Sequence, residues 1–107
     1  MIKYILERCV IKMRIITNEM INNFKMYLYE EEKSDNTIEK YMRDIRFFVE
    51  WLKDCEFDKS VVLEYKRELI EKYAPASLNS ILSSPNALFM YSNLCDLKVK
   101  IVIEKLK

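Results

Sequence analysis

Apolar residues recur at spacings of three and four between positions 38 and 52, which is the period of one face of an α-helix. They are Ile38, Tyr41, Met42, Ile45, Phe48, Val49 and Leu52. Charged residues fall outside this stripe: Glu39, Lys40, Arg43, Asp44, Arg46 and Glu50. Ser34 precedes the stripe as an N-cap, and Asn36 with Glu39 offers an alternative capping box two residues later. The pattern predicts an amphipathic helix with a buried face and a solvated face.

The same periodicity predicts a helix on either side of this one. Thr17 can cap a helix that runs to about Glu32. Its inward residues are Met20, Ile21, Phe24, Tyr27 and Leu28. Beyond a short connection, Asp58 can cap a helix from Lys59 to about Tyr73. Its inward residues are Val61, Val62, Tyr65, Leu69 and Ile70.

A fourth helix is predicted from Pro75 to about Asn93, because proline is tolerated in a first helical turn, where its missing N–H has no partner. Its inward residues are Leu78, Ile81, Leu82, Leu88 and Phe89, with Pro85 on the same stripe. Pro85 cannot donate a hydrogen bond to the carbonyl of Ile81, so we expect a kink or break near Ser83 and Ser84. Four helices with short connections predict a compact all-α bundle.

The two ends of the chain have weaker patterns. A helical stripe can form from Ile2, Ile5, Leu6, Cys9, Met13 and Ile16, although no clear cap precedes it. In the C-terminal tail, Leu97, Val99, Ile101 and Ile103 alternate with Lys98, Lys100, Val102 and Glu104. This period near two predicts a strand or an extended tail, and no partner strand is evident.

Composition then excludes several function classes. The 107 residues suffice for one domain and not for two. Glycine is absent, which excludes the dinucleotide-binding and P-loop fingerprints. Histidine is absent too, which removes the usual proton shuttle and the commonest metal ligand. We therefore expect no cofactor, no metal and no small-molecule substrate.

The cysteines and the charge distribution indicate the cellular compartment and the kind of partner. Cys9, Cys55 and Cys95 are far apart and form no CxxC pair, so we expect small buried thiols in a reducing cytoplasm rather than a metal or redox site. Charged residues interrupt the apolar N-terminal segment, so no signal peptide or membrane span is predicted. The formal net charge of +1 predicts no long-range attraction to nucleic acid, and any DNA site must use a local patch.

Two polar clusters are candidate binding features. The outward face of the fourth helix carries no charge and consists of Ser77, Asn79, Ser80, Ser83, Ser84 and Asn86. Short hydroxyl and amide side chains can bond phosphate oxygens or base edges at close approach, and a plain surface is the alternative. The turn at Ser34, Asn36 and Thr37 is either a simple helix cap or a phosphate site at a helix N-terminus.

Two further pairs lie off the apolar stripe of residues 38–52. Lys40 and Arg43 are either ordinary surface cations or phosphate contacts. Phe47 and Trp51, four residues apart, either widen the core contact against a neighbouring helix or offer a surface to a partner.

Two segments resemble the core-binding domain of phage integrases, the tyrosine recombinases. Residues 34–52 resemble its second helix, in which a Ser-x-Asn-Thr turn opens the pattern Tyr-x-x-Asp-Ile-x-x-Phe-x-x-Trp-Leu. Ala74-Pro-Ala-Ser-Leu-Asn-Ser-Ile-Leu-Ser-Ser84, followed by Leu88-Phe89-Met90-Tyr91, resembles its fourth helix, commonly Ser-Pro-x-Ser-x-Asn-x-x-Leu-Ser-x-Leu with aromatics at the end. The resemblance covers about residues 17–93. Pro85 departs from it, because relatives usually have an apolar residue such as leucine there.

The resemblance implies a four-helix, SAM-like domain that forms half of a clamp around DNA, with its second and fourth helices facing the duplex. Carried over position by position, it implies DNA contacts at Ser34, Asn36, Thr37, Lys40, Arg43, Ser77, Asn79, Ser80 and Ser83. The family's catalytic domain would follow this one. A chain without histidine cannot contain that catalytic site, so none of the seven tyrosines is expected to be a nucleophile.

We therefore expect a cytoplasmic, non-catalytic DNA-binding domain of a site-specific tyrosine recombinase, acting in DNA integration and recombination of a mobile element. Residues 1–16 would be an N-terminal extension, residues 17–93 the core-binding domain, and residues 94–107 a tail toward an absent catalytic domain. The expected partner is double-stranded DNA, with other recombinase protomers as a second option and no membrane. The alternative is a helical protein–protein interaction module that docks a partner through Phe47, Trp51 and the alternating tail.

Overall fold

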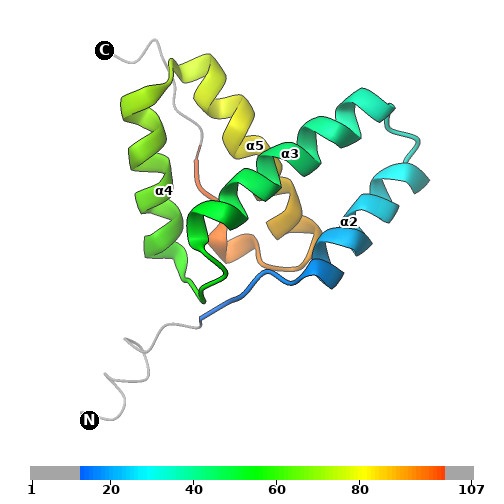
Figure 1. Ribbon diagram of the computed structural model, residues 1–107, viewed down its shortest axis with the longest axis horizontal. Coiled ribbons are helices and arrows are strands. Elements are labelled where there is room, and N and C mark those ends of the chain that lie inside the picture. The colour runs from blue at the N-terminus through cyan, green and yellow to red at the C-terminus, as the bar shows by residue number, and fades with distance from the viewer. Residues whose placement is uncertain (1–12, 101–107) are drawn as a thin grey trace.

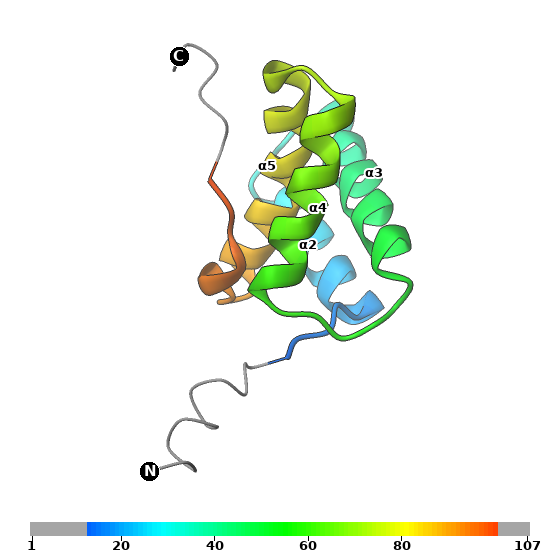
Figure 2. The ribbon, with the colours of Figure 1, turned by 90° about the vertical axis from the view of Figure 1, so that its left-hand side faces the viewer.

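The computed structural model describes residues 13–100, which form four α-helices and one short 3₁₀ helix (Figure 1). The elements are α2 (Asn18–Glu30), α3 (Asp35–Leu52), α4 (Lys59–Lys72), α5 (Pro75–Tyr91) and the 3₁₀ helix η1 (Cys95–Leu97). Helices α3 and α5 cross near the centre of the molecule, with α2 on one side and α4 on the other (Figure 1). Figure 2 shows η1 on the opposite side of α5 from α3. The prediction of an all-α, four-helix fold is confirmed.

Three of the four helices begin at the caps predicted from the sequence. The side-chain oxygens of Thr17, Ser34 and Asp58 accept backbone N–H bonds of 3.1, 3.1 and 3.2 Å from the residue three positions later. Asn36 lies inside α3, so the alternative capping box is not used. Helix α5 begins at Pro75 without a capping side chain, because its N-cap residue Ala74 has no polar side-chain atom. Proline is tolerated at this position because its missing N–H would have no partner in the first turn.

The core is centred on the contact between α3 and α5, the most extensive helix pair in the described residues. Ile45 and Phe48 of α3 are completely buried, as are Leu88 and Phe89 of α5. Full burial of a side chain of this size stabilises the fold by about 1.5–3 kcal/mol. The apolar stripe predicted for residues 38–52 is therefore the central seam of the molecule.

Some inward positions predicted from periodicity are wrong. Ile70 of α4 is 48% exposed and Tyr27 of α2 is 38% exposed. Both helices lie at the outside of the bundle, and a neighbouring element covers only part of each apolar face. Ser84, predicted on the outward face of α5, is fully buried against α3.

The predicted buried thiols are also wrong for the two cysteines that the structure describes. Cys55 and Cys95 are exposed, because both lie in connections outside the apolar helix faces. Cys9 lies outside the described residues.

A short bridge closes the core at the start of the described chain. The backbones of Arg14 and Phe57 exchange two hydrogen bonds of 2.7 and 2.8 Å, and the Phe57 ring is completely buried. Residues 13–17 are not helical, so a helical stripe through Met13 and Ile16 is wrong for those two residues. The rest of that predicted stripe lies outside the described residues.

Asn86 holds the C-terminal segment against α5. Its side-chain amide donates to the carbonyl of Val99 at 2.9 Å and accepts the Val99 N–H at 3.0 Å. Leu97 and Val99 are both buried. Leu97 lies in η1, so the predicted strand or extended tail is wrong at that residue, whereas residues 98–100 are outside any helix. The segment has no partner strand within the described residues, and this side-chain amide satisfies the backbone instead. Ile101 and Ile103 lie outside the described residues.

Helix α5 continues without interruption across Pro85, so the predicted break near Ser83 and Ser84 is wrong, whereas a kink there stays a prediction. The Pro85 ring is buried. Proline removes one hydrogen bond of the helix, and burial of the ring on the same stripe as Leu82 and Phe89 compensates for part of that loss.

We expect Pro85→Ala to raise the free energy of unfolding by about 1 kcal/mol. A proline inside a helix is about 3 kcal/mol less favourable than alanine, whereas the loss of two buried ring methylenes removes about 0.8 kcal/mol each. Urea denaturation followed by circular dichroism measures the difference. A lower free energy of unfolding would mean that the packing of the ring outweighs the missing hydrogen bond.

Tyr65 of α4 carries the one buried side-chain polar atom without a hydrogen-bond partner in residues 13–100. Its ring packs on Phe48 and Trp51, with centroid separations of 4.7 and 5.0 Å. Burial, and next the nearby Asp44 carboxylate, raise the pKa of the Tyr65 hydroxyl above its usual value near 10.

We expect Tyr65→Phe to raise the free energy of unfolding at neutral pH by about 1 kcal/mol, because it removes an unpaired buried hydroxyl and keeps the ring. The raised pKa means that the unfolded chain loses this proton first, so the wild type loses stability as the pH rises above about 10. The variant should lose less over that range. Tyr91→Phe, at an exposed tyrosine, is the control and should change neither quantity.

Candidate nucleic-acid interface

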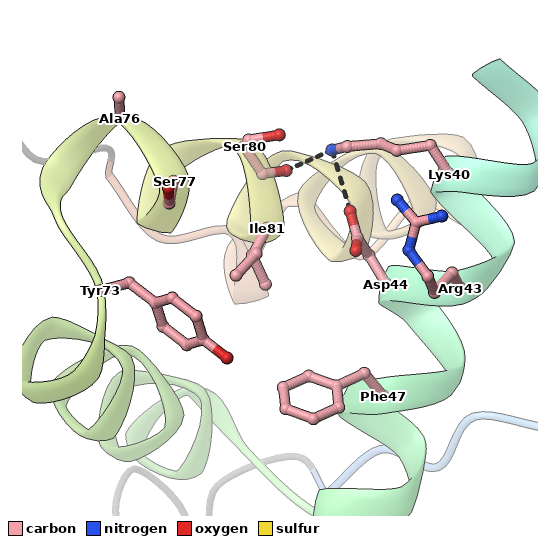
Figure 3. A pocket seen from close by; sticks show the side chains of 9 residues that line it. All are labelled: Lys40, Arg43, Asp44, Phe47, Tyr73, Ala76, Ser77, Ser80 and Ile81. Carbon is pink, nitrogen blue, oxygen red and sulfur yellow. Dashed lines mark hydrogen bonds and ion pairs between the residues drawn. The ribbon is translucent and has the colours of Figure 1, made fainter. Parts of the chain in front are cut away.

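A groove of about 610 Å³ lies between α3 and α5 and is closed at one end by the residues that join α4 to α5 (Figure 3). Its lining is Lys40, Arg43, Asp44, Phe47, Tyr73, Ala76, Ser77, Ser80 and Ile81. Four of these residues, namely Lys40, Arg43, Ser77 and Ser80, belong to the DNA contacts that the family resemblance implies. The crossing of α3 and α5 therefore brings together positions about forty residues apart in the chain.

Lys40 spans the groove from α3 to α5. Its ammonium group forms an ion pair of 2.9 Å with Asp44 and donates to the backbone carbonyl of Ser80 (Figure 3). The hydroxyls of Ser83 and Ser84 lie 3.4 and 3.3 Å from the same nitrogen. Lys40 is thus bonded within the protein, and its predicted phosphate contact stays a prediction.

Asp44 is the charged residue that the sequence analysis placed on the wrong face. It is buried, accepts a 2.9 Å hydrogen bond from the buried Ser84 hydroxyl, and faces Lys40 one turn earlier on α3. The spacing of four residues between a lysine and an aspartate was a signal for the ion pair. Its burial could not be foreseen, because it depends on where α5 crosses α3.

Arg43 supplies the accessible positive charge of the groove. Its side chain is exposed, and no hydrogen bond or ion pair within residues 13–100 holds it. It lies on the same side of α3 as Lys40 and Phe47, which line the groove with it (Figure 3). A guanidinium group in this position can bond a phosphate oxygen without breaking an existing contact.

The start of α5 contributes small polar groups. Ser77, Ser80 and Ser83 are exposed, and the Ser83 hydroxyl donates to the Ser80 carbonyl at 2.7 Å. The first turn has no acidic residue and no side-chain cap, so the N–H groups at this end are open to an anion. Asn79, from the same predicted set, is half-buried and does not line the groove.

The predicted turn at the start of α3 lies apart from the groove. Ser34, Asn36 and Thr37 are not among its lining residues. The Ser34 hydroxyl caps the helix and also donates to the Thr37 hydroxyl at 2.9 Å. Capping accounts for Ser34, and the phosphate-site alternative for this turn stays a prediction.

Apolar residues form the other wall of the groove. Phe47 is 46% exposed and Tyr73 is 39% exposed, and their rings face each other with Ile81 nearby (Figure 3). The place of Tyr73 in this wall could not be predicted from the sequence, because Tyr73 lies in the connection between α4 and α5, outside any helical stripe. Trp51 packs on Tyr65 and donates to Glu68 at 2.9 Å. For Trp51, the prediction that it widens the core contact with a neighbouring helix is therefore confirmed, and that helix is α4.

Comparison with known proteins gives one positive finding. Residues 21–93 match the family described as phage integrase, N-terminal SAM-like domain. No curated protein and no solved structure matches the chain. Within residues 13–100, none of the helices combines the length and hydropathy that a membrane crossing requires.

The match extends from α2 through α5 and therefore includes both walls of the groove. It gives the chain a role related to the tyrosine recombinases, in a domain that is not itself catalytic. Since the matched residues make up well over half of its length, the chain belongs to the phage integrase N-terminal SAM-like domain family.

Proposed function

We propose that the groove between α3 and α5 binds the backbone of double-stranded DNA, as the non-catalytic DNA-binding domain of a site-specific tyrosine recombinase. The observation that carries the proposal is the position of Arg43, which is exposed and unbonded within the described residues, opposite the uncapped start of α5. Membership of the integrase domain family supports duplex DNA as the partner.

Each part of the proposed site has a chemical task. Arg43 pairs with a phosphate oxygen through its guanidinium group. Ser77 and Ser80, with the N–H groups at the start of α5, donate to the same or a neighbouring phosphate. Hydroxyls as short as these permit close approach of the DNA backbone, which longer charged side chains would prevent.

The charge of the chain sets the expected strength. A formal net charge of +1 provides little long-range attraction, so affinity rests on the few phosphate contacts of the groove. Binding by this domain alone should therefore lie in the range of about 10⁻⁴–10⁻⁶ M, which is typical of non-specific association.

A protein partner is the second candidate function, favoured by the exposed rings of Phe47 and Tyr73 in the same groove. An apolar side chain of another protein could insert between them. This contact would depend little on salt, whereas each phosphate contact makes binding weaker as salt rises.

We expect Arg43→Gln to weaken binding to a short duplex of arbitrary sequence and to reduce the slope of log K against log salt by about 0.9, the value for one phosphate contact. Fluorescence anisotropy at several salt concentrations measures both quantities. Amide shifts on titration with the duplex should concentrate in residues 40–47 and 76–83.

Arg46→Gln is the matched control, because Arg46 is an exposed arginine on the same helix that lies near α2 and outside the groove. It removes the same charge and should leave the salt slope unchanged. Equal effects of the two substitutions would contradict the groove as the contact site. Absence of binding at low salt would contradict the DNA function itself.

A further inference from the structure

The buried carboxylate of Asp44 is the acidic group that lines the groove, and among residues 13–100 one cation is in contact with it. That cation is Lys40, whose ammonium nitrogen lies 2.9 Å from the Asp44 carboxylate (Figure 3). The side chain of Asp44 is 10% exposed and that of Lys40 is 29% exposed. A pair this far from solvent is screened much less by salt than a surface pair.

The other hydrogen bonds of Lys40 also hold its ammonium group within the protein. An ammonium group has three donors, and those of Lys40 face Asp44 on α3, the Ser80 carbonyl on α5, and the Ser83 and Ser84 hydroxyls on α5. The Ser84 hydroxyl donates to Asp44 in turn. The donors of Lys40 are therefore used within the protein, and Asp44 balances its charge.

We propose that Asp44 acts as an internal counter-ion that withholds Lys40 from DNA, so that Arg43 alone gives the groove its usable positive charge. The contacts of Lys40 support the counter-ion role of Asp44. The effect of that role on DNA affinity rests on the proposed function. It assigns Asp44 the role of a residue that limits affinity, although it touches no DNA. A domain that binds weakly on its own is the result.

The physical reason lies in counterion release. A cation contributes to the salt dependence of DNA binding when it neutralises a phosphate and displaces the ions condensed there. The ammonium of Lys40 already neutralises a carboxylate. Transfer to a phosphate would leave the buried Asp44 carboxylate without its cation, which is unfavourable for a buried charge.

Asp44→Asn tests the proposal, because the amide keeps the shape of the side chain and can still accept from Ser84. We expect the slope of log K against log salt to become steeper by about 0.9, corresponding to one additional phosphate contact. The double variant Asp44→Asn, Lys40→Gln should return the slope to the wild-type value. Glu39→Gln, which removes the same charge from an exposed position on α3, is the control and should leave the slope unchanged.

A second measurement does not depend on DNA. Acetylation by N-hydroxysuccinimidyl acetate, quantified by mass spectrometry on the full chain, reports how freely each lysine amine can react. We expect Lys40 to react more slowly than the exposed Lys33 in the wild type, and its rate to increase several-fold in Asp44→Asn. Thermal melts of each variant show that the comparison is made on folded protein.

The two measurements separate the possible failures. An unchanged salt slope and an unchanged Lys40 acetylation rate in Asp44→Asn would overturn the counter-ion role. A steeper slope that persists in the double variant would also overturn it, because the effect would then be one of general charge. If the acetylation rate rises as expected but no variant binds DNA, the hold on Lys40 stands and the proposed DNA function fails.

Discussion

The carboxylate of Asp44 lies in the contact between α3 and α5, where it accepts from the Ser84 hydroxyl and pairs with Lys40. A buried charge is tolerated when it has such partners, and these contacts favour the crossing at which all three groups meet. The apolar residues around them, including Ile45 and Leu88, provide the larger part of the stabilisation. The hydrogen bond from Ser84 to Asp44 links the two helices directly at this crossing.

Segments outside the helices complete the core around that crossing. Phe57 enters it from the connection between α3 and α4, held by its backbone bridge to Arg14. Val99 enters it from the tail, held by the amide of Asn86. In both cases the backbone lies outside any regular sheet within residues 13–100, and these hydrogen bonds satisfy its polar groups instead. An apolar side chain can therefore be buried there.

The same crossing sets the character of the groove. It places Lys40 and Arg43 near Ser77 and Ser80, and it buries Asp44 beside Lys40, with which Asp44 forms an ion pair. What remains accessible is one cation, a row of hydroxyls and an apolar wall. This composition supports the proposed short, local contact with DNA rather than long-range capture, in keeping with the near-zero net charge.

The sequence by itself determined the helices, three of their caps and the seam of α3, because helical period and cap chemistry depend on residues within a few positions of each other. It also singled out Lys40, Arg43, Ser77 and Ser80 of the groove, but not Tyr73 of its apolar wall. It could not place Asp44 and Ser84 in the core, since both lie beside the apolar stripe and become buried only through the angle at which α5 crosses α3. The same holds for Phe57, which owes its burial to a partner far away in the chain. Such contacts depend on which surfaces meet in three dimensions, and only the tertiary structure decides that.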